Sequence, residues 1–324
     1  MIKRRGVLAG AAGWTIVGAS AVRAQAWPTQ QVKIVVPYIP GGATDTAGRV
    51  LAEKLTTLLG QQVIVENKGG GNTIIGMDLV AKSKPDGHTL LLGTTTLATN
   101  AALGLKQPYD PLKDFQPIST VADIPDILAV HPSIPVKTLP ELVDWLAKQP
   151  EKTRYGTSGV GNQPHLWAEL LRARLNMKME NVAYKGVADT LRDVLAGHVP
   201  IIIDVVLPTG NHVAAGRLTG ICVASAERST ICPTVPTVGE LGMKDMESAV
   251  FYGLVAPAGV PRPVIDKLNG LVHEAIKDPA VIKKYSDLGF VMTGSTPEAY
   301  LEMLKFETAR WTKVVKDNRI KIEG

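Results

Sequence analysis

Two glycine-rich loops are the segments of this sequence best suited to chemistry, and that chemistry is the binding of an anion. The first loop, Gly41-Gly42, follows an apolar run at 31–37 and leads into an amphipathic stretch that starts at Thr44. Adjacent glycines let the backbone approach a ligand closely, and free N–H groups at the start of a helix favour a carboxylate or a phosphate. The second loop, at 156–165, repeats the order of strand, glycines and helix. Together the loops predict an anion site built largely from backbone groups.

The second loop does not match the known nucleotide-binding or hydrolase motifs. Gly159 and Gly161 provide G-x-G, but Pro164 stands where a dinucleotide-binding fingerprint needs its third glycine. No Gly-Lys-Ser/Thr follows, and Ser158 lacks the G-x-S-x-G context of a serine hydrolase. The six histidines have no metal-ligand spacing, and C-x-x-C and H-E-x-x-H are absent. The sequence therefore predicts no catalytic residues, no metal and no cofactor.

Four side chains near these loops are candidate ligand residues, and each has an ordinary structural alternative. Asp45 lies in the first turn of its predicted helix, where it can simply complement the helix dipole. His165 stands at a helix start and can instead pack between loops, and Lys185 can pair with an anion or stay solvated. Asp204 ends an apolar strand, where both ligand binding and helix capping are expected roles.

The first 26 residues have the pattern of a secretory signal peptide. Residues 3–5 are Lys-Arg-Arg, residues 6–22 are small and apolar, and Ala24-Gln25-Ala26 fits a cleavage site. Glycines dilute the apolar run below the roughly 20 strongly apolar residues of a membrane anchor. We therefore expect cleavage near Ala26 and a periplasmic location, by either the general secretory or the twin-arginine route.

Without this segment the chain is almost neutral. Its formal charge falls from +5 to +1, with 31 basic and 30 acidic residues. No later cluster of Lys and Arg is interleaved with aromatic residues in the way that nucleic-acid binding requires. We therefore expect no nucleic-acid partner, and no later apolar run is long and uncharged enough to span a membrane.

Two cysteines, Cys222 and Cys232, fall in the part that is expected to be exported. An oxidising compartment would permit a disulfide between them that closes a short loop. The alternative is one buried thiol and one loop thiol, because spacing alone does not show that the two Cβ atoms face each other. Both readings stay open from the sequence.

The elements that must position these residues are those of an α/β protein. Short β-branched segments alternate with amphipathic helical ones, which is typical of mainly parallel sheets, and the length allows two moderate cores. A proline-rich passage at 108–117 separates two such series. Strands are predicted at 31–37, 62–66, 88–93, 118–122, 127–131, 154–157, 181–184, 199–205 and 250–256. Helices are predicted at 44–59, 73–81, 139–147, 163–175, 187–196, 264–277, past 282, and from 297 to about 316.

The order of several short motifs resembles that of one family of receptors. The sequence is similar to the Bug (Bordetella uptake gene) receptors, the TctC-like solute-binding proteins of tripartite tricarboxylate transporters, over nearly the whole chain after the signal segment. Each motif is weak alone, but the ordered set is specific. The matching motifs are Pro40-Gly41-Gly42-Ala43-Thr44-Asp45, Glu66-Asn67-Lys68, Lys84-Pro85-Asp86-Gly87-His88, the loop at 156–161 with Pro164-His165-Leu166, Tyr184-Lys185-Gly186, and the run at 233–240.

The resemblance implies a two-lobed periplasmic binding protein, a type II-like Venus flytrap with its ligand cleft between the lobes. Lobe I is expected to contain residues 27–126 and 250–324, and lobe II residues 127–249. Hinges are expected near 124–131 and 248–252. Such a receptor closes on a small organic carboxylate and delivers it to membrane permease subunits.

The resemblance also implies where the ligand lies. In the family, backbone N–H groups and ordered water from the two loops hold the carboxylate. Asp45 is expected to organise its loop rather than to touch the anion, since two bare carboxylates would repel. The expected ligand-binding residues are Tyr38, Gly41, Gly42, Thr44, Asp45, Thr94, Thr95 and Thr96 from lobe I, with Ser158, Gly161, Asn162, His165, Lys185, Gly186 and Asp204 from lobe II.

Some residues depart from the family pattern, and alternatives to the transport function stay open. Ala43 and Asn162-Gln163 replace residues common in the family. The side-chain amides of Asn162 and Gln163 can influence which end of a ligand is recognised. A mono- or dicarboxylate, aliphatic or aromatic, or an acidic amino acid would fit, bound by a monomer. The alternatives are an exported α/β enzyme acting on a carboxylated substrate through Asp45, His165 or Asp204, and a receptor that feeds a sensor protein.

Overall fold

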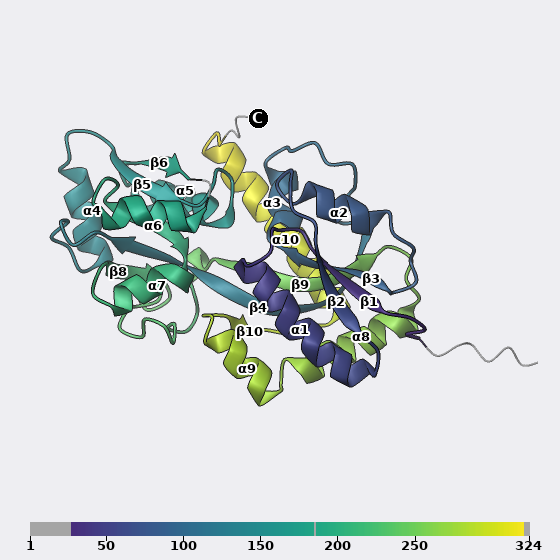
Figure 1. Ribbon diagram of the computed structural model, residues 1–324. Coiled ribbons are helices and arrows are strands. Elements are labelled where there is room, and N and C mark those ends of the chain that lie inside the picture. Colours follow the sequence, from purple (N-terminus) through teal and green to yellow (C-terminus); the bar gives the residue numbers. More distant parts are fainter. Residues whose placement is uncertain (1–26, 185, 321–324) are drawn as a thin grey trace, which may run out of the picture.

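Two α/β lobes share one long strand in the computed structural model, which describes residues 27–184 and 186–320 (Figure 1). The predicted signal peptide at 1–26 lies outside the described residues. No helix in the described part is both long enough and apolar enough to cross a membrane. The α/β class and the two-lobed form expected from the sequence are confirmed.

The first lobe is built on a sheet in which β1 lies between two parallel neighbours, β2 and β3. β9 is antiparallel to both β3 and β4, and β10 pairs with the outer side of β4. The strands are β1 (Val32–Val36), β2 (Val63–Asn67), β3 (Thr89–Thr94), β4 (Phe115–Val130), β9 (Ala249–Pro257) and β10 (Val291–Met292).

The second lobe continues the sheet beyond β4. β7 and β8 both pair antiparallel with the last part of β4, and β5 runs parallel to β6 and β7. The carboxyl ends of β5, β6, β7 and β8 therefore all meet at the edge that faces the first lobe. The strands are β5 (Thr153–Thr157), β6 (Met179–Ala183), β7 (Ile201–Val205) and β8 (Thr219–Val223).

β4 corrects the prediction of two separate strands at 118–122 and 127–131. It is one strand of 16 residues, and Pro117 and Pro125 lie within it. Register shifts in its pairing with β9 accommodate the first proline, and Pro125 pairs with Ala249 where β4 leaves β9 for β7. The strand therefore crosses between the lobes without a break.

Helices cover both faces of each half of the sheet. Along β1, Ile34 packs toward α1, α8 and α9, while its neighbour Val35 packs toward α2 and α10, as the alternation of a strand requires. In the second lobe, Trp167 of α5 packs with α4 on one face and Leu191 of α6 lies on the other. The helices of the first lobe are α1 (Ala43–Leu59), α2 (Ile74–Ala81), α3 (Thr96–Ala102), α8 (Arg262–Ala275), α9 (Pro279–Ser286) and α10 (Pro297–Asp317). Those of the second are α4 (Leu139–Ala147), α5 (Gln163–Leu175), α6 (Val187–Leu195) and α7 (Val206–Ala214), with a 3-10 turn η1 (Lys244–Met246).

The C-terminal helix α10 contacts both lobes. Trp311 and Val314 pack in one cluster with Ala102 of α3 and Leu166 of α5. In Figure 1 the helix runs behind the junction, between α3 and the second lobe. The predicted limits of the lobes, 27–126 with 250–324 and 127–249, stay a prediction.

Cys222 and Cys232 are both buried free thiols, so the structure contains no disulfide between them. They belong to different core clusters, Cys222 with the second-lobe core and Cys232 with the cluster that includes β1 and α1. Burial raises the pKa of the Cys222 thiol to about 12, which keeps it protonated and unreactive.

Candidate functional site

The first glycine loop is shaped by the carboxylate of Asp45. Gly41 donates its backbone N–H to Oδ2 at 2.9 Å, Arg49 donates to the same oxygen at 3.1 Å, and Asn67 donates to Oδ1 at 3.0 Å. Gly41 has φ +88°, a left-handed conformation that favours glycine. Burial alone would raise the pKa of Asp45, but these hydrogen bonds and the charge of Arg49 bring the pKa below its usual value. Asp45 therefore organises the loop as an anion, the role expected for it.

A chain of hydroxyl groups lines the first lobe beside this loop. The Tyr38 hydroxyl lies 2.8 Å from the Thr94 hydroxyl, which lies 3.0 Å from that of Thr96. Thr73 extends the chain by donating to Thr96 at 3.0 Å. Such hydroxyls can rotate to donate to an incoming anion or to water. The structure thus brings Tyr38, Thr94 and Thr96 together as predicted, with Thr95 as the residue that precedes α3.

Thr73 was not predicted to belong to the site, and its backbone is strained. It has φ +73°, an outlier for a β-branched residue, and Asn72 before it has φ +50°. Asn100 holds this turn by donating to the Asn72 carbonyl at 2.8 Å. Strain of this kind collects at ligand sites, where the surrounding structure maintains it.

The second glycine loop is held by Asp204 and Asn162. Ser158 donates its N–H to Oδ2 of Asp204 at 2.9 Å, and Asn162 donates from its amide to the Ser158 hydroxyl at 2.9 Å. The Asn162 side chain also accepts the N–H of His165 at 3.0 Å, which caps α5. Asp204 therefore fixes the loop as Asp45 does in the first lobe.

His165 is held as a neutral imidazole. Gly161 donates its N–H to Nδ1 at 2.8 Å, so the ring proton lies on Nε2. Burial lowers the pKa of His165. The ring can offer one donor from Nε2 but carries no charge at neutral pH.

Backbone N–H groups without a side-chain cap occur at the starts of α1 and α6. Gly42 precedes α1 and Gly186 precedes α6, and within the described residues neither helix has a side-chain cap, which is also true of α3 and α7. By contrast, the N–H groups of Gly41, Ser158 and Gly161 are already occupied by protein acceptors. The predicted cradle therefore reduces to two open helix N-termini, one in each lobe, which are natural anion-binding positions.

A buried polar chain that was not predicted connects the second loop to the crossing strands. Gln163, the first residue of α5, donates to the Ser248 hydroxyl at 2.8 Å, and Ser248 donates to Oδ2 of Asp126 at 2.7 Å. Asp126 and Ser248 also share a backbone hydrogen bond of 3.1 Å, and both lie where β4 and β9 pass between the lobes. The start of α5 is thus tied to the hinge region.

Two buried acids in this region, Asp126 and Asp204, have raised pKa values. Burial raises the pKa of Asp126 to about 8, with a further contribution from the charge of Asp204, while Ser248 and Arg310 oppose the rise. Burial also raises the pKa of Asp204 to about 6, against hydrogen bonds from Val205 and Ser158. Because the two acids interact, they titrate as a coupled pair.

The predicted residues form two groups, one in each lobe, and no hydrogen bond among the described residues joins the groups directly. Thr44 does reach the crossing strands, because its side chain is close enough to the Tyr252 hydroxyl to oppose the rise that burial causes in the pKa of Tyr252. Lys185 lies outside the described residues, so its predicted role stays a prediction. Within residues 27–184 and 186–320, no three His, Cys, Asp or Glu side chains are placed to hold a metal ion.

Comparison with known proteins gives a consistent picture. Residues 47–320 match the model of the tripartite tricarboxylate transporter family receptor. Protein BugT of Bordetella pertussis is 33% identical over 307 residues, which cover 94% of each chain.

Two solved structures of similar proteins contain carboxylates. Rpa4515 of R. palustris, described with adipate, has 32% identity and a TM-score of 0.80, covering 91% of this chain and 99% of its own. MatC of Rhodopseudomonas palustris, described with bound malate, has 29% identity and a TM-score of 0.75, covering 89% of this chain and all of its own.

Proposed function

The chain belongs to the tripartite tricarboxylate transporter receptor family, and from that premise we propose that it captures an aliphatic dicarboxylate by lobe closure and delivers it to membrane permease subunits. Proteins of this family are periplasmic substrate-binding receptors and not enzymes. Removal of residues 1–26 and action as a monomer are parts of the same proposal.

The observation that carries the ligand class is the pair of open helix N-termini. α1 begins after Gly42 in one lobe and α6 begins after Gly186 in the other, and neither has a side-chain cap. Each presents unpaired N–H groups and the positive end of a helix dipole. Two such positions on opposite lobes suit a ligand with a carboxylate at each end, which would favour the closed form by contacting both lobes.

Two further features support a carboxylate of modest size. The hydroxyls of Tyr38, Thr94 and Thr96 supply neutral donors beside the first helix. Two similar proteins, Rpa4515 and MatC, are described with adipate and with bound malate, both aliphatic dicarboxylates. Neutral donors suit these ligands because they bind an anion without requiring a buried cation.

Calorimetric titration tests this proposal with matched ligands. We expect succinate, malate or adipate to bind, and hexanoate, which has the length of adipate but one carboxylate, to bind at least about tenfold more weakly. Hexanoate binding as tightly as adipate would contradict the dicarboxylate assignment. No binding by any acid in the panel would contradict the receptor function proposed for this site.

A further inference from the structure

A second cavity lies between the lobes, away from every residue predicted to bind the carboxylate. It has a volume of about 1020 Å³, and its walls come from the loop after β8, from η1, and from α9, β10 and α10. Cavities of roughly 300–1,000 Å³ are the usual size for small-molecule sites. The space is therefore large enough for an organic molecule.

The end of the cavity that contains Asp123 and Phe251 is on the opposite face of the crossing strands from the first glycine loop. On β9, Ala249 and Phe251 line the cavity, whereas Tyr252 points to the other face and reaches Thr44 of α1. On β4, Asp123 lines it in the same alternating way. A ligand in this cavity would therefore be separate from one at the start of α1.

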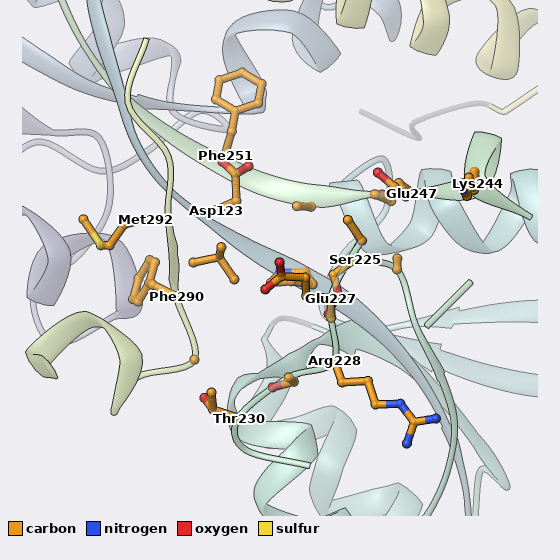
Figure 2. A pocket seen from close by; sticks show the side chains of 18 of the residues that line it. Asp123, Ser225, Glu227, Arg228, Thr230, Lys244, Glu247, Phe251, Phe290 and Met292 are labelled. Carbon is orange, nitrogen blue, oxygen red and sulfur yellow. Dashed lines mark hydrogen bonds between the residues drawn. The ribbon is translucent and has the colours of Figure 1, made fainter. Parts of the chain in front are cut away.

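Asp123 brings a carboxyl group to this cavity without a partner of its own. Figure 2 shows the carboxyl of Asp123 beside Phe251. Its side chain makes no hydrogen bond or ion pair within the described part of the chain, and the charge of Glu307 lies nearby. Arg310, a basic residue of the cavity wall, pairs with Glu307 and donates to a backbone carbonyl. The cavity thus has an uncompensated negative end.

Apolar side chains lie on the same face of the sheet as Asp123. Phe251 is beside the carboxyl in Figure 2, and Val291 pairs directly with Asp123 between β10 and β4. Phe306 and Val291, at the edge of the cavity, are 64% and 50% exposed, which is unusual for large apolar side chains. Aromatic faces beside a carboxylate attract a cation, and apolar surroundings favour a hydrophobic body.

We propose that this cavity is a second binding site, for a small organic ammonium ion with an apolar body. The ammonium pairs with Asp123, and the body packs on Phe251, Val291 and Phe306. A metal ion does not fit, because no group of three ligating side chains occurs in the described part of the chain. An anion does not fit either, because Asp123 and Glu307 would repel it.

The proposal also implies a pH dependence. Burial, with the charge of Glu307, raises the pKa of Asp123 to about 7. Tyr300, which packs with Phe251 on this face, stays neutral because burial raises its pKa, and Glu307 and Arg310 of α10 supply the nearby charges. An ammonium binds the ionised carboxylate, so affinity should rise between pH 6 and pH 8.

The test is titration of the full-length mature chain with phenethylamine and benzyltrimethylammonium, followed by calorimetry or by NMR. At pH 8 we expect at least one of them to bind and Asp123→Asn to weaken that binding by about tenfold or more. The neutral analogue 2-phenylethanol should bind correspondingly more weakly than phenethylamine. Glu180→Gln, on the exposed side of β6, is the matched control and should bind as the native chain does.

A second variant keeps the test independent of Asp123. Ala226 is exposed at the cavity wall, so Ala226→Trp should fill the space without disturbing the core and should abolish ammonium binding. Thermal unfolding checks that both variants are folded. Failure of both ammonium probes at millimolar concentration, or native affinity in both variants, would overturn the proposal. Adipate binding, measured on the same samples, reports separately on the carboxylate site.

Discussion

The backbone N–H of Gly41 donates to the carboxylate of Asp45 at 2.9 Å, and the same carboxylate receives Arg49 and Asn67. The acid in the first turn of α1 therefore folds the loop back on its own helix. Asp45 directs its oxygens to these partners, and the N–H groups that follow Gly42 at the start of α1 have no side-chain cap.

Valine at the two glycines that precede the open helices should abolish ligand binding and leave the fold intact. Gly42 has φ −80°, and an added Cβ would meet only the Ile39 carbonyl at 4.0 Å; at Gly186 it would meet nothing within 4 Å. Gly42→Val and Gly186→Val should therefore unfold at the native temperature but bind no dicarboxylate in calorimetry. Gly270→Ala, on an open face of α8, is the control and should bind normally.

Asp45→Asn should weaken both the fold and ligand binding. An amide cannot accept all three donors, so we expect a loss of about 1–3 kcal/mol in the free energy of unfolding, measured in urea. The pKa of Asp45 is lowered in the folded state, so its contribution is present at neutral pH and is lost as the pH falls below about 4. The pH dependence between 5 and 2 should flatten in the variant.

The exposed pair of Arg262 and Asp266 provides the control for this change. It has the same spacing along a helix, but both side chains are more than half exposed. Asp266→Asn should change the unfolding free energy by only about 0.5 kcal/mol or less. An equal effect at the two positions would contradict a special role for Asp45.

Asp126→Asn should stabilise the protein at alkaline pH. The pKa of Asp126 is raised to about 8 in the folded state, compared with about 4 in the unfolded chain. The neutral carboxyl therefore contributes stability that is fully present below about pH 4. This contribution to stability is lost as the pH rises through 8. The amide can still accept the Ser248 hydroxyl. We expect the melting temperature of the variant to exceed the native value by about 2 °C or more at pH 9, with the difference shrinking toward pH 6. A constant difference at both pH values would contradict this titration.

Ser248→Ala should reduce affinity for the carboxylate although Ser248 does not belong to either glycine loop. The change removes the acceptor of Gln163 at the start of α5 and, among residues 27–184 and 186–320, the only side-chain donor to Asp126. We expect about tenfold weaker binding and a loss of about 1–3 kcal/mol in stability. Ser83→Ala, which removes a hydroxyl bonded only within the turn after α2, should leave affinity unchanged.

Local patterns in the sequence predicted most of the fold. The alternation of short apolar runs with helical segments located β1, β2, β3 and α5 within two residues, and Thr138 caps α4 in the predicted capping box. The elements that were not predicted are α3, α7, β8 and β10. The strands β8 and β10 are short. The single strand β4 was predicted as two strands because proline usually ends a strand.

Prediction of the site was limited for a different physical reason. Glycines and first-turn acids indicate a loop from local sequence, and Asp45 could therefore be assigned correctly. The partners of Ser248 are remote in sequence, with Gln163 and Asp126 lying 85 and 122 residues away. Hydrogen bonds across such separations depend on the assembled topology, so no local pattern could indicate them. The same holds for the unpartnered Asp123.

The most direct measurement is a crystal structure of the mature chain with adipate. We predict one carboxylate within hydrogen-bond distance of the N–H groups that follow Gly42 in α1, and the other near those that follow Gly186 in α6, with the lobes closed around the ligand. Adipate bound without contact to either helix start, or bound in the cavity beside Asp123, would contradict capture of a dicarboxylate between the two helix N-termini.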